Sequence, residues 1–541
     1  MEEHGVAIAW PSQRKGLRSM ESVHKKTALK DAADLILAAH DLGEGLLWER
    51  YEQQLPLCAF TSNGLNCRKC FQGPCRISPF GDEPSRGVCG ADRDQILMET
   101  LFQSTREGVM ETAQSLRLLG IGGADQGFAD MASDLPAETQ KRLGSLGLLP
   151  VKKEDLFEVQ NSYFAHKGYL DQTLLDLTRL GLIHYGFLKQ AEASLSRTAR
   201  KASPFDPEGV NLLVVGQAPI GFVEAVAEQA PQKSGGRKIN FLVQGGNRLP
   251  FTTVACDHGS PELTLGTNVD ALVMAPNAPF PGLETLARKY NLPVILMDRT
   301  RSFSETASEA IGHAVEHAKQ AVHGTASKVL PAGEGGNPIV GRAKEVSQAL
   351  ASGQLRGVLV LFGEANVKQT FFDRTLALMR AALAERVLVL LGGDITSEMD
   401  LLVAELGKEN ASQLSAFSAE LVREGLAPFS TFGSAFEIPR VVSFLGSLAG
   451  GRELFSLPVI AAFPEFYRAS TWATAVTFLS LGCTVQVGTR LPFWGSPSLT
   501  EVLLTGWSKI TGGKLLVAPA LPDSNGQAEE MVSFLKTKRV S

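Results

Sequence analysis

The first third of the chain has the hydrophobic pattern of helices interrupted by one loop. Residues 31–55 and 95–119 place apolar side chains at positions i, i+3, i+4 and i+7, the spacing of an amphipathic helix. The segment between them, residues 58–89, has glycine, proline or asparagine every few residues, which predicts a loop. We therefore predict a helical domain over residues 1–205 that carries a cysteine-rich loop at 58–89.

Beyond residue 205 the pattern changes to short apolar runs alternating with helical segments. Nine runs rich in Val, Ile and Leu predict strands: 211–216, 239–246, 271–277, 294–299, 357–364, 386–394, 458–465, 484–489 and 514–519. Continuous apolar strands that alternate with helices are typical of parallel sheets covered on both faces. Nine strands suit two sheets, so we predict two Rossmann-like domains, 206–352 and 353–541. The overall fold class is α/β.

The carboxyl ends of these strands carry the candidate polar site. In open parallel sheets, ligands bind beyond the carboxyl ends of the strands. This rule selects Gln217, Asn277, Glu364, Asp394 and Glu465. Two carboxylates at adjoining strand ends, Glu364 and Asp394, can bind a hard cation or act as acid and base, since their repulsion separates their pKa values. The alternative is that they cap helices or pair with a basic residue.

The basic residues considered for that pairing are Arg299 and Lys289. Gln217, Asn277 and Ser434 are candidates to line the same cavity with hydrogen-bonding groups, or to serve as caps and turn residues. The catalytic candidates are therefore Glu364, Asp394 and Gln217.

Composition narrows the class of protein. The 541 residues include 52 Lys and Arg against 57 Asp and Glu, a formal net charge of −5, which argues against a nucleic-acid partner. Mean hydropathy is +0.02, and no stretch approaches the roughly 20 apolar residues of a membrane helix. The first residues do not have the pattern of a secretory signal. We therefore expect a cytoplasmic protein without a membrane span.

Five of the seven cysteines lie between Cys58 and Cys89. The spacing Cys67-x2-Cys70-x4-Cys75-x13-Cys89 places four thiolates on one loop, a set that can hold a [4Fe-4S] cubane. The alternative is a zinc site with four cysteines, although zinc ribbons usually show a second C-x2-C pair. Positive charge at Arg68, Lys69 and Arg76 is expected to raise the potential of such a cluster, unless these are ordinary surface charges.

At this loop the sequence resembles a known family. Residues 47–96 and 491–519 resemble the first and closing segments of the catalytic subunit of anaerobic nickel–iron carbon monoxide dehydrogenase, and residues 239–247, 268–283 and 432–442 follow its order with weaker similarity. Hybrid-cluster proteins are the nearest alternative. The resemblance implies a helical iron–sulfur domain followed by two Rossmann-like domains. It also implies that Cys67, Cys70, Cys75 and Cys89 hold an electron-relaying cubane.

The departures from the family concern its buried nickel–iron–sulfur cluster, which one His and five Cys hold. When the strand ends are matched, those positions fall on Gln217, Ala278, Lys289, Glu364, Asp394 and Ala435. Only Cys256 and Cys483 lie beyond Cys89, so five thiolates cannot be supplied. We therefore expect no nickel, and the same count excludes a hybrid cluster. The family's proton-relay positions fall near Thr112, Ser115 and Ser470, which cannot fill those acid–base roles.

The family also joins two subunits through a cluster with two cysteines from each chain. Here Cys58 is present, but Asn66 stands at the second position. We expect a homodimer formed through the helical domain, in which Cys58 is either a ligand at the interface or a leftover thiol.

The remaining sequence motifs can each be explained by an ordinary structural role. His313, Glu316 and His317 match the H-x-x-E-H pattern of zinc proteases, but helix faces often show this spacing by chance. Cys256 and His258 can form a small site or belong to a turn, Cys483 is expected in the core, and Trp494 in packing or an interface. The glycine-rich segments 120–127 and 333–341 lack the context of a phosphate loop.

These observations predict an iron–sulfur protein with one [4Fe-4S] cluster per chain. Its expected role is electron transfer to a redox partner or to a small substrate other than carbon monoxide. The alternatives are a non-catalytic scaffold or regulatory homologue that binds a redox partner, and, more remotely, carbon monoxide oxidation itself. Whether the chain is an enzyme stays open at this stage.

Overall fold

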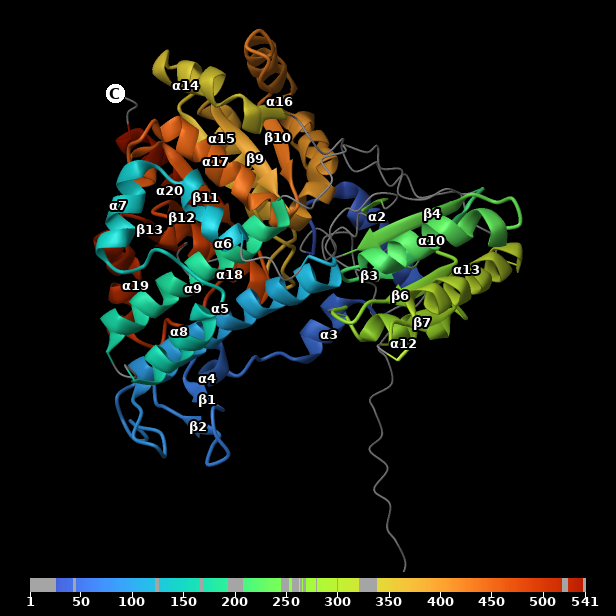
Figure 1. Ribbon diagram of the computed structural model, residues 1–541, viewed down its shortest axis with the longest axis horizontal. Coiled ribbons are helices and arrows are strands. Elements are labelled where there is room, and N and C mark those ends of the chain that lie inside the picture. Colours follow the sequence, from blue (N-terminus) through green and yellow to red (C-terminus); the bar gives the residue numbers. More distant parts are fainter. Residues whose placement is uncertain are drawn as a thin grey trace, which may run out of the picture.

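The computed structural model in Figure 1 places a helical region beside two parallel sheets. It describes residues 26–41, 45–121, 126–165, 169–192, 208–244, 253–254, 262, 265, 269–278, 280–298, 300–320, 338–517 and 524–538. The helical region and the six-stranded sheet share one large core, and the five-stranded sheet has a second, smaller core on one face.

The cysteine loop lies at one end of the helical region, and the six-stranded sheet lies against the other (Figure 1). Its elements are α2 (Lys30–Asp41), α3 (Leu47–Gln53), α4 (Ala59–Ser62), β1 (Asn66–Cys67), β2 (Cys75–Arg76), α5 (Arg93–Leu118), α6 (Gln126–Asp130), η1 (Met131–Asp134), α7 (Ala137–Ser145), α8 (Asp155–Ala165) and α9 (Leu170–Glu192). The cysteine segment is a loop as predicted, except for α4 and the two-residue hairpin of β1 and β2.

The long helix α5 begins where the cysteine loop ends. Asp92 caps it by accepting a hydrogen bond from the Gln95 backbone N–H at 3.0 Å, and the Gln95 side chain accepts one from the Asp92 backbone N–H at 3.0 Å. Further along, Gly108 lets α18 (Ala469–Ser480) approach closely, because a Cβ there would overlap the carbonyl of Ala469. Gly181 on α9 does the same beside Ser480. Glycines therefore bring α5, α9 and α18 together.

The first sheet consists of five parallel strands in the order β5-β4-β3-β6-β7. The strands and helices of this part are β3 (Val210–Val215), α10 (Ile220–Lys233), β4 (Ile239–Gln244), β5 (Thr253–Val254), β6 (Ala271–Met274), α12 (Gly282–Lys289), β7 (Val294–Leu296) and α13 (Phe303–Gln320). The next two elements in the chain, η2 (Pro338–Gly341) and α14 (Ala343–Ala351), pack instead with the six-stranded sheet's part of the molecule (Figure 1). The strand order reverses between β3 and β6, which makes the space beyond these two strands the switch point of the sheet.

The second sheet has six parallel strands in the order β10-β9-β8-β11-β12-β13, with its reversal between β8 and β11. This part comprises β8 (Gly357–Leu361), α15 (Asp373–Ala384), β9 (Val387–Gly392), η3 (Gly393–Glu398), α16 (Met399–Val422), β10 (Phe429–Gly433), η4 (Ala435–Glu437), α17 (Ile438–Ala449), η5 (Leu454–Ser456), β11 (Val459–Phe463), α18, β12 (Thr484–Val487), α19 (Pro497–Ile510), β13 (Lys514–Val517) and α20 (Ser524–Thr537).

The structure confirms the predicted fold class. Each of the nine predicted strand segments contains a strand, and they are divided between two parallel sheets. The strands β5 and β10 were not predicted. β10 reads Phe-Ser-Thr-Phe-Gly, with too few aliphatic residues to stand out, and it lies at the edge of its sheet. The domain boundaries near 205 and 352 stay predictions. None of the helices described is long and apolar enough to span a bilayer.

Candidate functional site

The switch points of both sheets open onto one cavity. Gln217 follows β3 and Asn277 follows β6 in the first sheet, whereas Glu364 follows β8 and Asp394 follows β9 in the second. All four line a cavity of about 80 Å³, to which α5, α9, α18 and η4 also contribute residues. Its other lining residues are Glu111, Thr112, Ser115, His184, Leu188, Phe362, Gly363, Gly392, Gly393, Ala435, Phe436, Arg468, Ser470, Thr471 and Thr474. The volume is enough for several water molecules or a small ligand.

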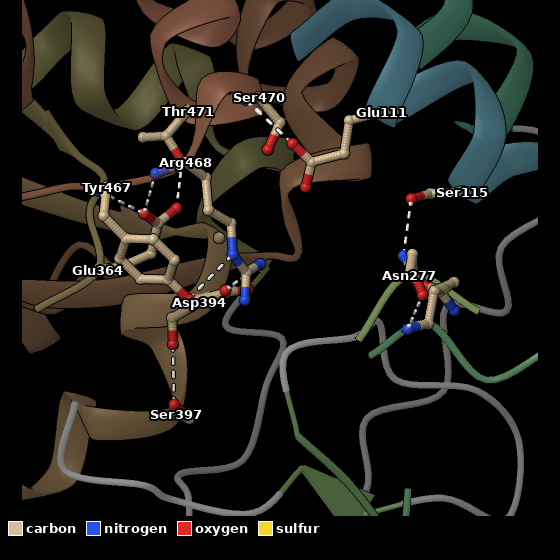
Figure 2. A network of polar contacts seen from close by, with 12 residues as sticks. Glu111, Ser115, Asn277, Glu364, Asp394, Ser397, Tyr467, Arg468, Ser470 and Thr471 are labelled. Carbon is tan, nitrogen blue, oxygen red and sulfur yellow. Dashed lines mark hydrogen bonds and ion pairs between the residues drawn. The ribbon is translucent and has the colours of Figure 1, made fainter. Parts of the chain in front are cut away.

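Glu364, Arg468 and Asp394 form the polar centre of this cavity (Figure 2). Arg468 Nη1 lies 2.7 Å from Asp394 Oδ2 in an ion pair. Glu364 Oε2 accepts the backbone N–H groups of Tyr467 at 3.2 Å and Arg468 at 3.3 Å, and Thr471 donates its hydroxyl to Glu364 Oε1. The start of α18 therefore holds the Glu364 carboxylate through main-chain and side-chain donors, while the Arg468 guanidinium neutralises Asp394.

Burial and charge oppose each other at Glu364. Loss of hydration raises the pKa of Glu364 to about 7, with the Asp394 carboxylate contributing in the same direction, although Arg468 and the hydrogen bonds act against them. The pKa of Arg468 is raised, because attraction to Asp394, Tyr467, Glu364 and Glu111 outweighs its burial. Glu364 can therefore take up or release a proton near neutral pH.

The helical side of the cavity contributes groups that the sequence analysis did not select. Glu111 on α5 accepts the Ser470 backbone N–H at 3.3 Å (Figure 2). His184 on α9 is fully buried, with Nε2 2.9 Å from Thr112 Oγ1 and Nδ1 2.8 Å from Thr477 Oγ1. Burial lowers the pKa of His184 to about 3, so its imidazole is neutral at physiological pH.

Not every residue selected from the strand ends reaches this cavity. Asn277 Oδ1 accepts the Gln217 backbone N–H at 2.9 Å, which ties together two lining residues of the first sheet. Ser434 instead forms a capping box with Glu437 at the start of η4 and does not line the cavity, so the capping alternative holds for it. Of the positions matched to the family's cluster ligands, Ala435 lines the cavity, whereas Ala278 and Lys289, the last residue of α12, are not among its described lining residues.

Glu465 is at the end of β11 but points away from the cavity. Its Oε2 accepts the backbone N–H of Phe372, just before α15, at 3.0 Å, while Oε1 has no hydrogen-bond partner among the described residues. Burial raises the pKa of Glu465 from its usual 4.5 to about 8, against the opposing effects of Phe372 and Arg374.

Glu465 should therefore make the stability of the protein pH-dependent. Between about pH 4.5 and 8 the unfolded chain loses this proton first, so the native state binds more protons and stability falls as the pH rises. Because of this group, we expect the free energy of unfolding of the wild type to fall by about 2 kcal/mol between pH 5.5 and pH 7. The Glu465→Gln variant should lack this part of the fall. Urea unfolding of both proteins at pH 5.5 and pH 7 measures this difference. The same change in unfolding free energy in wild type and variant, or an equal effect of Glu284→Gln, would contradict the raised pKa of Glu465.

The four predicted cluster cysteines line a second cavity, of about 240 Å³, beside the start of α5. Cys67 and Cys75 face each other across the β1–β2 hairpin, and Cys70 and Cys89 come from the loops that follow. The Val88 backbone N–H lies 3.4 Å from Cys75 Sγ. Among the residues described, no three His, Cys, Asp or Glu side chains converge on the position of a single metal ion.

A buried acidic residue stands behind the cysteines. Glu99 on α5 accepts hydrogen bonds from Lys69 Nζ at 2.6 Å, from Gln103 Nε2 at 2.8 Å and from the hydroxyl of Tyr163. Burial by itself would raise the pKa of Glu99, but these three donors outweigh it and hold the pKa below its usual value. Lys69 and Glu99 line the same cavity as the four cysteines.

The remaining candidates are dispersed. Cys58 is exposed, and hydrogen bonds from Thr61 hold its pKa below the usual value. Cys483 is buried as expected, which raises the pKa of its thiol to about 12. His317 lies 3.2 Å from Asp270, and Lys319 donates to Glu316 at 2.8 Å, so the H-x-x-E-H residues have separate partners.

Trp494 packs against Phe493, with ring centroids 5.2 Å apart. Cys256, His258 and Arg299 lie outside the described residues. Among the described residues, the basic partner of Asp394 is Arg468, whereas Lys289 ends α12 outside the cavity.

Comparison with known proteins shows which proteins this chain is similar to in sequence. Residues 254–521 match the model of the Prismane/CO dehydrogenase family. Carbon monoxide dehydrogenase 1 of Methanosarcina acetivorans is 24% identical, over 95% of this chain and 98% of its own. Carbon monoxide dehydrogenase 2 of Carboxydothermus hydrogenoformans is 25% identical, over 91% and 95%.

Solved structures agree on the fold. A nickel-free crystal structure of carbon monoxide dehydrogenase from Thermococcus sp. AM4 superimposes with a TM-score of 0.79 at 21% identity, covering 95% of this chain and 97% of that one. Carbon monoxide dehydrogenase IV of Carboxydothermus hydrogenoformans gives a TM-score of 0.77 at 20% identity, covering 95% and 99%. The chain thus has the carbon monoxide dehydrogenase fold and resembles the catalytic subunit of that enzyme along nearly its whole length.

Proposed function

We propose that this chain is an iron–sulfur electron-transfer protein on the carbon monoxide dehydrogenase scaffold. In this proposal Cys67, Cys70, Cys75 and Cys89 hold one [4Fe-4S] cluster, which supplies one-electron redox chemistry when bound. A small molecule other than carbon monoxide would occupy the cavity between the two sheets. No nickel–iron cluster would be present.

The observation that carries the proposal is the cavity of about 240 Å³ that the four cysteines line. A zinc ion needs its four sulfur ligands about 2.3 Å from one point, whereas a cubane needs them spread around a cage. Thiols that surround a cavity suit the cubane better. The Val88 N–H beside Cys75 Sγ adds a donor of the kind that tunes cluster potentials.

The donor set of the inter-sheet cavity does not fit a nickel–iron cluster. Among the described residues that line it there is no cysteine, and both ring nitrogens of His184 already have threonine partners. Carboxylates exceed cations there, with Glu111, Glu364 and Asp394 against Arg468. An anionic ligand is therefore disfavoured, and a small neutral or cationic molecule with hydrogen-bonding groups is favoured.

A second candidate function is a scaffold that binds a redox partner or a second copy of the chain. It is favoured by the apolar side chains exposed around the cysteine loop, where Leu55, Phe71, Phe80 and Val88 lie at the surface. Exposed apolar groups gathered in one region often mark an interface. This surface would serve a homodimer formed through the helical domain, with the exposed Cys58 close in sequence.

Metal analysis and electron paramagnetic resonance test the proposal. Anaerobically purified protein is expected to contain about four irons per chain and to give a paramagnetic signal after reduction with dithionite. Zinc in place of iron would overturn the cluster assignment. A cluster that no mild reductant can reduce would favour the scaffold. Viologen reduction by carbon monoxide in a nickel-loaded sample would show that the carbon monoxide chemistry is retained.

A further inference from the structure

Of the three basic residues near the cysteines, Lys69 is the one that lines their cavity. Glu99 lines the same cavity. All three basic residues are exposed to some extent, and Arg76 lies 5.5 Å over the ring of Phe60. Neither arginine lines that cavity. The two arginines are therefore matched controls for charge effects that do not depend on position.

Lys69 is held in place from two sides. Its Nζ lies 2.6 Å from Glu99 Oε2 and 5.2 Å from the centre of the Tyr163 ring. Tyr163 is buried and stacks on Phe102 with ring centroids 4.0 Å apart. The carboxylate and the ring come from α5 and α8, so two helices fix the position of a charge that belongs to the loop.

The Glu99 carboxylate that pairs with Lys69 is itself held by further hydrogen bonds. The Glu99 side chain is only 7% exposed, and Gln103 and Tyr163 donate to it as well as Lys69. It therefore keeps two donors when Lys69 is removed. A buried carboxylate with several donors usually serves to orient its partner or to balance a charge nearby.

We propose that Lys69 raises the reduction potential of the cluster and that Glu99 is the positioning residue that fixes its ammonium group against the cysteine cavity. This inference rests on the proposed function, since it needs a cluster on the four cysteines. The physical reason is Coulombic. Reduction adds negative charge to the cluster, and a fixed positive charge in a partly buried site stabilises that charge more than a mobile one in water.

Potentiometric titration of a double-mutant cycle tests this proposal. Lys69→Gln is expected to lower the midpoint potential, and Lys69→Arg to keep it near that of the wild type. In a Glu99→Gln background the same Lys69→Gln change is expected to have a smaller effect, because an unfixed ammonium contributes less. Arg76→Gln is the matched control and should shift the potential far less than Lys69→Gln.

The outcomes separate this inference from the function on which it rests. Wild-type protein without an iron cluster would refute the proposed function. A cluster whose potential is the same with and without Lys69, or that responds equally to Arg76→Gln, would overturn the role of Lys69. Strictly additive shifts for Lys69→Gln and Glu99→Gln would overturn the positioning role of Glu99. A purely structural role for the pair would change stability and leave the potential unchanged.

Discussion

Cys75→Ser is expected to abolish iron binding and to lower the free energy of unfolding by about 4 kcal/mol or more, the range seen when a structural metal centre is lost. A serine hydroxyl is a poor ligand for the iron of a cubane, which is held by thiolates. Cys75 lies opposite Cys67 in the β1–β2 hairpin and close to the Val88 N–H, so a cluster there connects both ends of the loop. Iron content and thermal unfolding of anaerobic protein measure the two effects.

Cys58→Ser is the control for this prediction. It makes the same chemical change on an exposed cysteine outside the cavity of the other four. We expect its iron content to match that of the wild type. Equal iron in Cys75→Ser and wild type would refute the ligand assignment, whereas equal loss in both variants would place Cys58 in the metal site.

Arg468→Met is the prediction with the next largest effect. Removing one partner of a buried ion pair leaves an uncompensated charge and costs about 3–5 kcal/mol. Here Arg468 is 15% exposed and the Asp394 side chain 37%, so we expect the lower end, about 3 kcal/mol at pH 7. The cost should shrink toward pH 5, because Glu364, whose pKa burial raises to about 7, is then neutralised by a proton.

Urea unfolding of the Arg468→Met variant at both pH values measures this effect. Arg288→Met is the control, since Arg288 pairs with Glu284 at 2.8 Å but is 62% exposed, and exposed pairs contribute about 0–1 kcal/mol. A loss of stability no greater than in the control would show that Arg468 does not neutralise the cavity carboxylates.

The candidate site was predictable as far as strand ends are visible in the sequence. Glu364, Asp394 and Gln217 each follow an apolar run directly, and all three line one cavity. Arg468 also follows such a strand, but four residues separate it from the end of β11. Glu465, which the strand-end rule selected, turns toward α15, and the chain then brings Arg468 into the cavity.

The residues contributed by helices could not be selected in this way. Glu111 and His184 belong to long helices with many polar and apolar positions, and nothing in the spacing of α5 or α9 distinguishes them. They reach the cavity because Gly108 and Gly181 let α18 pack closely on these helices. That close approach brings together residues more than 280 positions apart in the chain, such as His184 and Thr477, which are 293 apart.

The sequence by itself determined the α/β class, the two parallel sheets and the crowding of cysteines on one loop, because strand periodicity and ligand spacing are local properties of the chain. Only the tertiary structure decided that both switch points open onto one cavity, that Arg468 pairs with Asp394 there, and that Lys69 rather than its neighbouring arginines lines the cavity of the four cysteines. These depend on how helices and sheets pack across long separations in sequence, where burial and the pairing of charges choose among side chains that look equivalent in the sequence.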